Sequence, residues 1–117
     1  MPEVCKIMSP DDWDGSFGKG EQYVAVIEAD LRDGFIHCSS DEQVDGTLAK
    51  WYTDVDRVVV VTIDADKLTS ELKWEPNFEG ILFPHIYGPI VPEAVAGKVT
   101  MERSEAGEFQ ASGAVGN

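Results

Sequence analysis

The chain has few cations, few cysteines and no long apolar run. Of its 117 residues only nine are lysine or arginine, against 22 aspartate or glutamate, which gives a formal net charge of −13. Such an acidic surface repels a phosphate backbone, so nucleic-acid binding by a charged face is not expected. A small anionic ligand remains compatible with this charge, because a local site can oppose the global field.

The apolar runs of the sequence are also short. No run approaches the roughly 20 apolar residues that span a bilayer, and the N-terminus MPEVCKIM lacks the features of a secretory signal. We therefore expect a cytoplasmic protein that does not associate with membranes. Cys5 and Cys38 have apolar neighbours and are expected to be reduced and buried. No further soft ligand lies at a suitable spacing, so no metal is expected.

Expected strands and helices are interspersed without a regular βαβ rhythm. Strands are expected at 4–8, 35–39, 57–63, 71–76, 81–88 and 96–103. Helices are expected after Ser9 and over 41–53, both behind serine caps, whereas 23–34 is compatible with a strand or a short helix. This order predicts an α+β fold with a curved, mainly antiparallel sheet and two or three short helices.

Two strands have a predicted place in the sheet. The unbroken β-branched run RVVVVTI is typical of a central strand that is covered on both faces. Pro84 argues against a central position for 81–88, because proline cannot donate to the ladder. We expect a single domain over 1–103, followed by a small, polar tail over 104–117 that frays.

The only two histidines lie in short apolar segments flanked by glycine, GFIHCS (34–39) and FPHIYG (83–88). In an extended backbone each segment places an aromatic ring, an imidazole and a hydroxyl on one face: Phe35, His37 and Ser39 in the first, and Phe83, His85 and Tyr87 in the second. Two such rows that meet across a cleft would form a mostly apolar pocket with a few polar groups, which is typical of small-ligand sites.

His37 also precedes an expected helix N-terminus. Free N–H groups there attract anions, and the dipole favours a neutral imidazole. A neutral histidine suits a ribose hydroxyl or a leaving group, because one nitrogen donates and the other accepts. The structural alternatives stay open: each histidine as a buried structural residue, Ser39 and Ser40 as helix caps, and Tyr87 as a core residue.

The segments DGFIHCSSDEQV and FPHIYGPI, with KIMSPDDW near the N-terminus, resemble the bacterial domain-of-unknown-function family 952. The resemblance extends to about Arg103. That family is grouped with the ADP-ribosyltransferase superfamily, in a two-histidine branch that includes the RNA 2′-phosphotransferases. The resemblance implies a split antiparallel sheet with an NAD-sized cleft, and NAD as a substrate.

The resemblance also implies roles for individual residues. His37 with Ser39 would bind the ribose and nicotinamide side of NAD, His85 would be the motif residue of the second strand, and Tyr87 a stacking partner. The predicted site consists of the catalytic residues His37 and His85 and of the ligand-binding residues Phe35, Ser39, Ser40, Tyr87 and Arg32. The RNA-acting relatives use several arginines; this chain has only Arg32, Arg57 and Arg103, so an RNA substrate is not expected.

Three functions fit these observations. The first is an ADP-ribosyltransferase-like enzyme that acts on NAD or a related small nucleotide through the two histidines. The second is a non-enzymatic small-molecule-binding domain, which the few arginines and the unassigned catalytic acid favour; Glu71, Glu75 and Glu79 are candidates for that acid only because they precede the second motif. The third is a two-histidine phosphoesterase, against which HIY supplies a phenol instead of a small hydroxyl. The sequence does not indicate an oligomeric state.

Overall fold

The run RVVVVTID forms β3 (Arg57–Asp64), which pairs on both sides within a four-stranded antiparallel sheet. The computed structural model describes residues 3–111 and orders this sheet β1-β3-β6-β7, with β1 at Glu3–Met8, β6 at Val95–Arg103 and β7 at Phe109–Ala111. Val59 and Val61 enter the core on one face of β3, and Val58 and Val60 enter the core on the other. The β-branched run is therefore buried on both faces, as predicted.

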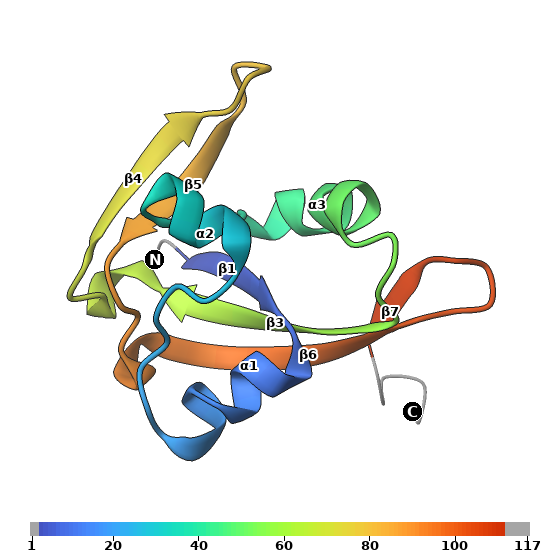
Figure 1. The fold of residues 1–117 in the computed structure, drawn as a ribbon, viewed down its shortest axis with the longest axis horizontal. Coiled ribbons are helices and arrows are strands. Elements are labelled where there is room, and N and C mark those ends of the chain that lie inside the picture. The colour runs from blue at the N-terminus through green and yellow to red at the C-terminus, as the bar shows by residue number, and fades with distance from the viewer. Residues whose placement is uncertain (1–2, 112–117) are drawn as a thin grey trace.

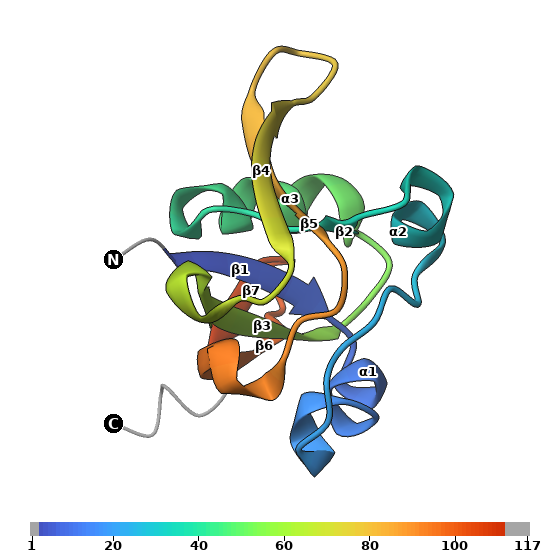
Figure 2. The same ribbon diagram turned by 90° about the vertical axis from the view of Figure 1, so that its left-hand side faces the viewer.

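A second, three-stranded antiparallel sheet packs on one of these faces. Its order is β2-β5-β4, with β2 at Ile36–His37, β5 at Leu82–Tyr87 and β4 at Glu71–Pro76. Ile36 and Ile86 pack in the same core as Val59 and Val61. The β4–β5 hairpin extends beyond the rest of the molecule (Figures 1 and 2). The α+β class with antiparallel sheets and short helices is thus confirmed.

Short helices connect the strands and cover the sheets. They are α1 (Pro10–Asp14), η1 (Phe17–Lys19), α2 (Glu28–Asp33), η2 (Asp41–Gln43), α3 (Val44–Trp51), η3 (Ala65–Lys67) and η4 (Pro92–Ala94). Val44 and Leu48 of α3 pack on the face of the large sheet that lies opposite Ile36 and Ile86. No helix within 3–111 is long and apolar enough to cross a bilayer. The ambiguous segment 23–34 resolves into the helix α2, behind an isolated bridge between Tyr23 and Ile90.

The predicted strand 35–39 is shorter in the structure, because the chain changes sheets within it. Ile36 and His37 pair with β5, whereas Ser39 exchanges backbone hydrogen bonds with Cys5 of β1: Ser39 N donates over 2.8 Å and Ser39 O accepts over 2.7 Å. This segment therefore links the two sheets. The predicted helix 41–53 likewise divides into η2 and α3 and ends at Trp51.

The expectation that Pro84 keeps its strand from a central position is wrong, since β5 lies between β2 and β4. The reason is local. The register of His37 with His85 places Cys38 opposite Pro84, and Cys38 N donates to Pro84 O over 3.0 Å. The donor that Pro84 lacks would face Cys38, where β2 has already ended, so the ladder loses little.

Part of the segment that was expected to fray is also a strand. Phe109–Ala111 forms β7 and pairs with Met101–Arg103 of β6. The Arg103 guanidinium lies 4.4 Å from the centre of the Phe109 ring, and this contact favours the pairing. Residues 112–117 of the predicted tail lie outside the described residues.

Gly88, directly after β5, has a conformation and a contact that only glycine permits. Its φ is +144°, and a Cβ there would lie 2.5 Å from Ser70 Oγ, which donates to Pro89 O over 2.6 Å. We expect Gly88→Ala to lower the free energy of unfolding by about 1–3 kcal/mol in urea titrations. The control is Gly46→Ala in α3, where a Cβ meets nothing within 4 Å and helix propensity predicts a gain of up to about 1 kcal/mol. Equal stability of the Gly88 variant and the unmodified protein would contradict this account.

Candidate functional site

The two histidines lie side by side. His37 of β2 and His85 of β5 are directly opposite each other in the antiparallel ladder, and their ring centroids are 5.4 Å apart at an interplanar angle of 64°. Because directly opposite residues point to the same face of a sheet, the pairing of β2 with β5 is enough to bring both imidazoles together. The two segments that contain the histidines thus form one cluster, although they are far apart in the sequence.

Phe35 and Tyr87 complete a cluster of four rings. The Phe35 ring stacks on His85 with a centroid distance of 4.0 Å, and it lies 4.5 Å from His37 and 5.2 Å from Tyr87. The stack covers His85, whose side chain is 11% exposed, whereas that of His37 is 35% exposed. His37 is therefore the more accessible of the two imidazoles.

Two buried charged residues, Asp30 and Lys6, fix the position of His37. Asp30 Oδ1 accepts from the backbone N of His37 over 3.0 Å and lies 2.7 Å from its Nδ1, while Lys6 Nζ donates to Asp30 Oδ2 over 2.9 Å. Lys6 and Asp30 are both almost completely buried. Burial acts to raise the pKa of Asp30, but hydrogen bonds from His37 and the charge of Lys6 together hold this pKa below its ordinary value. Asp30 is thus a carboxylate that fixes the orientation of the His37 ring.

A second carboxylate faces the other nitrogen of His37. Asp33 Oδ2 lies 3.0 Å from His37 Nε2, and Arg32 donates to both oxygens of Asp33, over 2.9 Å from Nε and 3.1 Å from Nη2. The hydrogen bond and the charge of Arg32, and after them the interaction with His37, lower the pKa of Asp33. Both ring nitrogens of His37 thus lie within hydrogen-bond distance of a carboxylate, Nδ1 at 2.7 Å from Asp30 and Nε2 at 3.0 Å from Asp33.

His85 has its own carboxylate, Glu75 of β4. Glu75 Oε1 lies 2.8 Å from His85 Nδ1 and accepts from the Tyr87 hydroxyl over 2.6 Å. The hydrogen bond with Tyr87 lowers the pKa of Glu75 and raises that of Tyr87 to about 12. Each histidine therefore has a carboxylate at Nδ1. Nε2 is then the atom that can meet a ligand or exchange a proton, although in His37 this nitrogen already faces Asp33.

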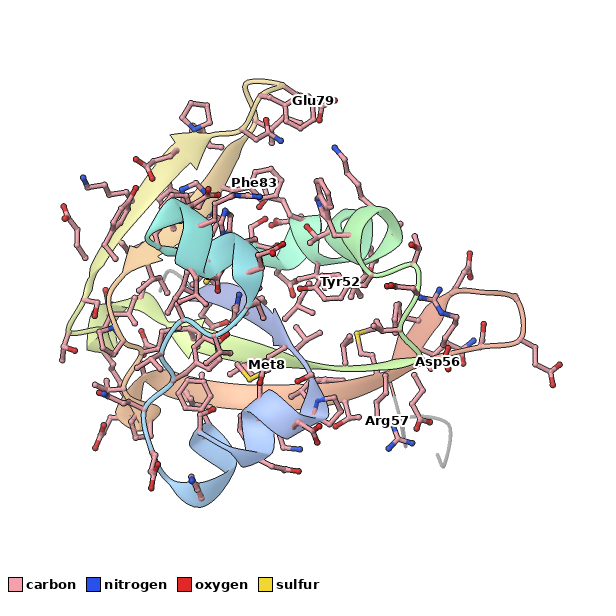
Figure 3. The ribbon with its side chains drawn as sticks, viewed as in Figure 1. Met8, Tyr52, Asp56, Arg57, Glu79 and Phe83 are labelled. Carbon is pink, nitrogen blue, oxygen red and sulfur yellow. The ribbon has the colours of Figure 1, made fainter. Side chains whose placement is uncertain are left out.

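The other two glutamates that precede the second motif lie elsewhere. Glu71 is opposite Tyr87 in the β4–β5 ladder, and Glu79 lies at the hairpin tip, 3.7 Å from Lys50 Nζ (Figure 3). Phe83 belongs to the same face of β5 as His85, because side chains alternate along a strand. Of the three candidate acids, Glu75 is therefore the one that contacts a histidine.

Ser39 and Ser40 do not join the cluster. The Ser39 side chain is buried, and its Oγ lies 3.1 Å from Thr47 Oγ1. Ser40 caps η2 in a full capping box with Gln43: its Oγ accepts from Gln43 N over 3.3 Å, and its own N donates to Gln43 Oε1 over 2.9 Å. Ser40 is therefore a helix cap, which is one of the alternatives that the sequence left open. Its hydroxyl accepts a hydrogen bond from the N-terminus of η2 instead of contacting the ring cluster.

The sequence interpretation missed Lys6, Asp30 and Asp33. Lys6 had a signal: it shares a face of β1 with Val4 and Met8, which are both core residues, so it had to be buried. A buried lysine needs a carboxylate partner, but the sequence does not indicate which one. Within 3–111 no group of three or more potential metal ligands lies together.

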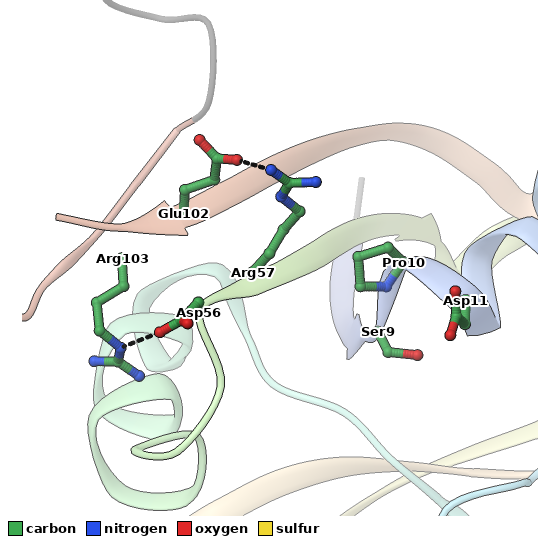
Figure 4. Close-up of a pocket in the computed structure, with 7 residues that line it drawn as sticks. All are labelled: Ser9, Pro10, Asp11, Asp56, Arg57, Glu102 and Arg103. Carbon is green, nitrogen blue, oxygen red and sulfur yellow. Dashed lines mark hydrogen bonds and ion pairs between the residues drawn. The ribbon is translucent and has the colours of Figure 1, made fainter.

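An open hollow of about 610 Å³ lies elsewhere on the surface (Figure 4). Its lining residues are Ser9, Pro10, Asp11, Asp56, Arg57, Glu102 and Arg103. Both guanidinium groups already have partners, since Arg57 pairs with Glu102 and Arg103 donates to backbone carbonyls, including that of Val55 over 2.8 Å. The hollow contains neither histidine, and both of its guanidinium groups have partners within the protein, so the ring cluster remains the better candidate site.

Solved structures of protein CC0527 from Caulobacter crescentus resemble this chain over nearly its whole length. The crystal structure has a TM-score of 0.81 at 33% identity and covers 93% of this chain and 94% of that chain. The solution NMR structure has a TM-score of 0.79 at 34% identity, with coverage of 94% and 93%. No curated protein gives a significant match. The model of the family described as "Protein of unknown function (DUF952)" matches residues 7–98, and the chain therefore belongs to this family.

Proposed function

We propose that the protein is an ADP-ribosyltransferase-like enzyme that acts on NAD or a related small nucleotide through His37 and His85. The observation that supports this most is the pair of imidazoles 5.4 Å apart, each with a carboxylate at Nδ1. A carboxylate at Nδ1 orients an imidazole and stabilises its protonated form, so Nε2 can act on a substrate. The two antiparallel sheets agree with the split sheet that the family resemblance implies.

The reaction needs few groups from the protein. The bond between the nicotinamide nitrogen and ribose C1′ breaks, and its electron pair leaves with nicotinamide, which becomes neutral. C1′ then accepts an electron pair from water or another nucleophile, and the proton of that nucleophile passes to Nε2 of His85. Glu75 holds Nδ1 of His85 at 2.8 Å and stabilises the imidazolium that results. His37, the more exposed ring, contacts the nucleotide.

A non-enzymatic nucleotide-binding domain is the second candidate. It is favoured by the covered state of both rings: Asp33 lies against Nε2 of His37, and Phe35 stacks on His85. The proposed enzyme uses both histidines and must uncover both rings when the substrate binds, whereas a binding domain needs only one of the two. The two candidates differ in whether bound NAD is consumed.

The test is a time course with millimolar NAD, in which free nicotinamide is quantified by chromatography and binding is followed by the shift in melting temperature. We expect nicotinamide release above the rate without protein, together with a positive shift. A positive shift with intact NAD after long incubation would favour the binding domain. No shift and no release would remove both candidates for NAD.

A further inference from the structure

The Asp33 carboxylate is held at three points. Arg32 Nε donates to Oδ1 over 2.9 Å, Arg32 Nη2 donates to Oδ2 over 3.1 Å, and His37 Nε2 lies 3.0 Å from the same Oδ2. A guanidinium fork with a neighbouring imidazole is also the arrangement that binds two oxygens of a phosphate. Asp33 therefore occupies a ready anion-binding geometry.

We propose that Asp33 stands in for a substrate phosphate: His37 Nε2 and Arg32 form an anion subsite, which opens when the Asp33 side chain turns away. The inference rests on the proposed function, since it names the diphosphate of the nucleotide as the group that His37 contacts. The three-point geometry at Asp33 favours this phosphate over the ribose hydroxyl that the family resemblance implies for His37.

His37 and Asp33, the two residues of this contact, differ in how firmly the rest of the protein holds them. His37 is fixed from behind by the buried pair of Asp30 and Lys6, and Lys6 Nζ also donates to its carbonyl over 3.0 Å. Asp33 is the last residue of α2 and precedes Gly34, which has a φ of +82° and open space around the position of a Cβ. Asp33 is thus the partner that can move.

A phosphate is expected to interact more strongly with Arg32 than the Asp33 carboxylate does. The Arg32 side chain is 68% exposed and that of Asp33 is 31% exposed, so water screens their ion pair and it contributes little. A phosphate brings more negative charge and more acceptor oxygens than a carboxylate. The net charge of the chain is −13, so an exposed guanidinium beside an imidazole is one of the few places where an anion can bind.

Three variants test the subsite with inorganic pyrophosphate as the probe, by calorimetry at low salt and by the ring ¹⁵N shifts of His37. Asp33→Ala removes the competing carboxylate and is expected to bind pyrophosphate about five- to tenfold more tightly than the unmodified protein. The additional substitution Arg32→Ala should abolish that gain. Asp54→Ala, which removes an exposed charge between α3 and β3, is the matched control and should leave affinity unchanged.

The inference is wrong if Asp33→Ala binds no more tightly than Asp54→Ala, or if the gain persists without Arg32. Pyrophosphate contains no nicotinamide, so this result is independent of turnover. Tight pyrophosphate binding without NAD cleavage would remove the proposed enzyme and keep the subsite. Nicotinamide release without any gain in Asp33→Ala would remove the subsite and keep the enzyme.

Discussion

His85→Ala is expected to lower kcat for nicotinamide release by roughly 10²–10⁴, the contribution of one positioned acid or base. His37→Ala is expected to act differently and mainly to raise KM for NAD, because in the proposed mechanism this ring contacts the nucleotide rather than the attacking nucleophile. The basis is the difference in environment: His85 is covered by Phe35 and bound to Glu75, whereas the side chain of His37 is 35% exposed and faces Arg32 and Asp33. Steady-state kinetics of both variants separate the two parameters.

The glutamine variants are the controls for structural effects. Glutamine has an amide N–H that can still donate to Asp30 or Glu75, but it cannot exchange a proton near neutral pH. His85→Gln should therefore unfold at nearly the same urea concentration as the unmodified protein and still lose kcat. Turnover that survives in His85→Gln would give this ring a structural role only.

The sequence predicted much of this site because the side chains of a strand alternate. Period-two geometry placed Phe35 with His37 and His85 with Tyr87 on common faces, and the structure has these four rings in contact. What alternation cannot give is the pairing partner. That β2 pairs with β5 depends on Ile36 and Ile86, which share the core with many other apolar residues of similar kind.

The charged part of the site was harder to predict. The chain has 22 acidic residues, and nothing in the sequence distinguishes Asp30 from the solvated ones. Its segment is compatible with a strand or a helix, and only the helix α2 brings Asp30 and Asp33 to the two nitrogens of His37. For Ser39 the alternation rule predicted a place in the cluster that the structure does not show. The rule fails because the chain stops pairing with β5 before Ser39, and Ser39 pairs with Cys5 of β1 instead.

The buried pair of Lys6 and Asp30 is expected to dominate the stability of the site. Lys6→Met or Asp30→Leu alone leaves one charge buried without its partner, which costs about 3–5 kcal/mol. The double variant removes both charges and recovers part of that loss, because the backbone N of His37 still lacks its acceptor. Urea unfolding of the four proteins forms a double-mutant cycle. The exposed pair of Lys19 and Glu21, with 3.7 Å between their charged atoms, is the control and should change stability by less than about 1 kcal/mol.

The same cycle gives a pH dependence with a defined sign. The pKa of Asp30 is lower in the folded protein than its ordinary value of about 3.9, so its charge stabilises the fold above that pH. This contribution is lost as the pH falls through the lower, folded pKa. The double variant should therefore lose less stability than the unmodified protein when the pH is lowered from 5 toward the acid limit of folding. An identical acid limb in both proteins would mean that Asp30 does not carry this charge.

The double variant also separates the fold from the function. Its apolar side chains restore packing, but they leave Nδ1 of His37 without the acceptor that lies at 2.7 Å in the structure. The ring then loses the acceptor that fixes its orientation, as happens when a triad histidine loses its aspartate. We expect a folded protein that is more stable than either single variant, together with a KM for NAD raised at least about tenfold. If KM stays unchanged in a double variant that is fully folded, Asp30 serves only the fold, and His37 meets the nucleotide without its help.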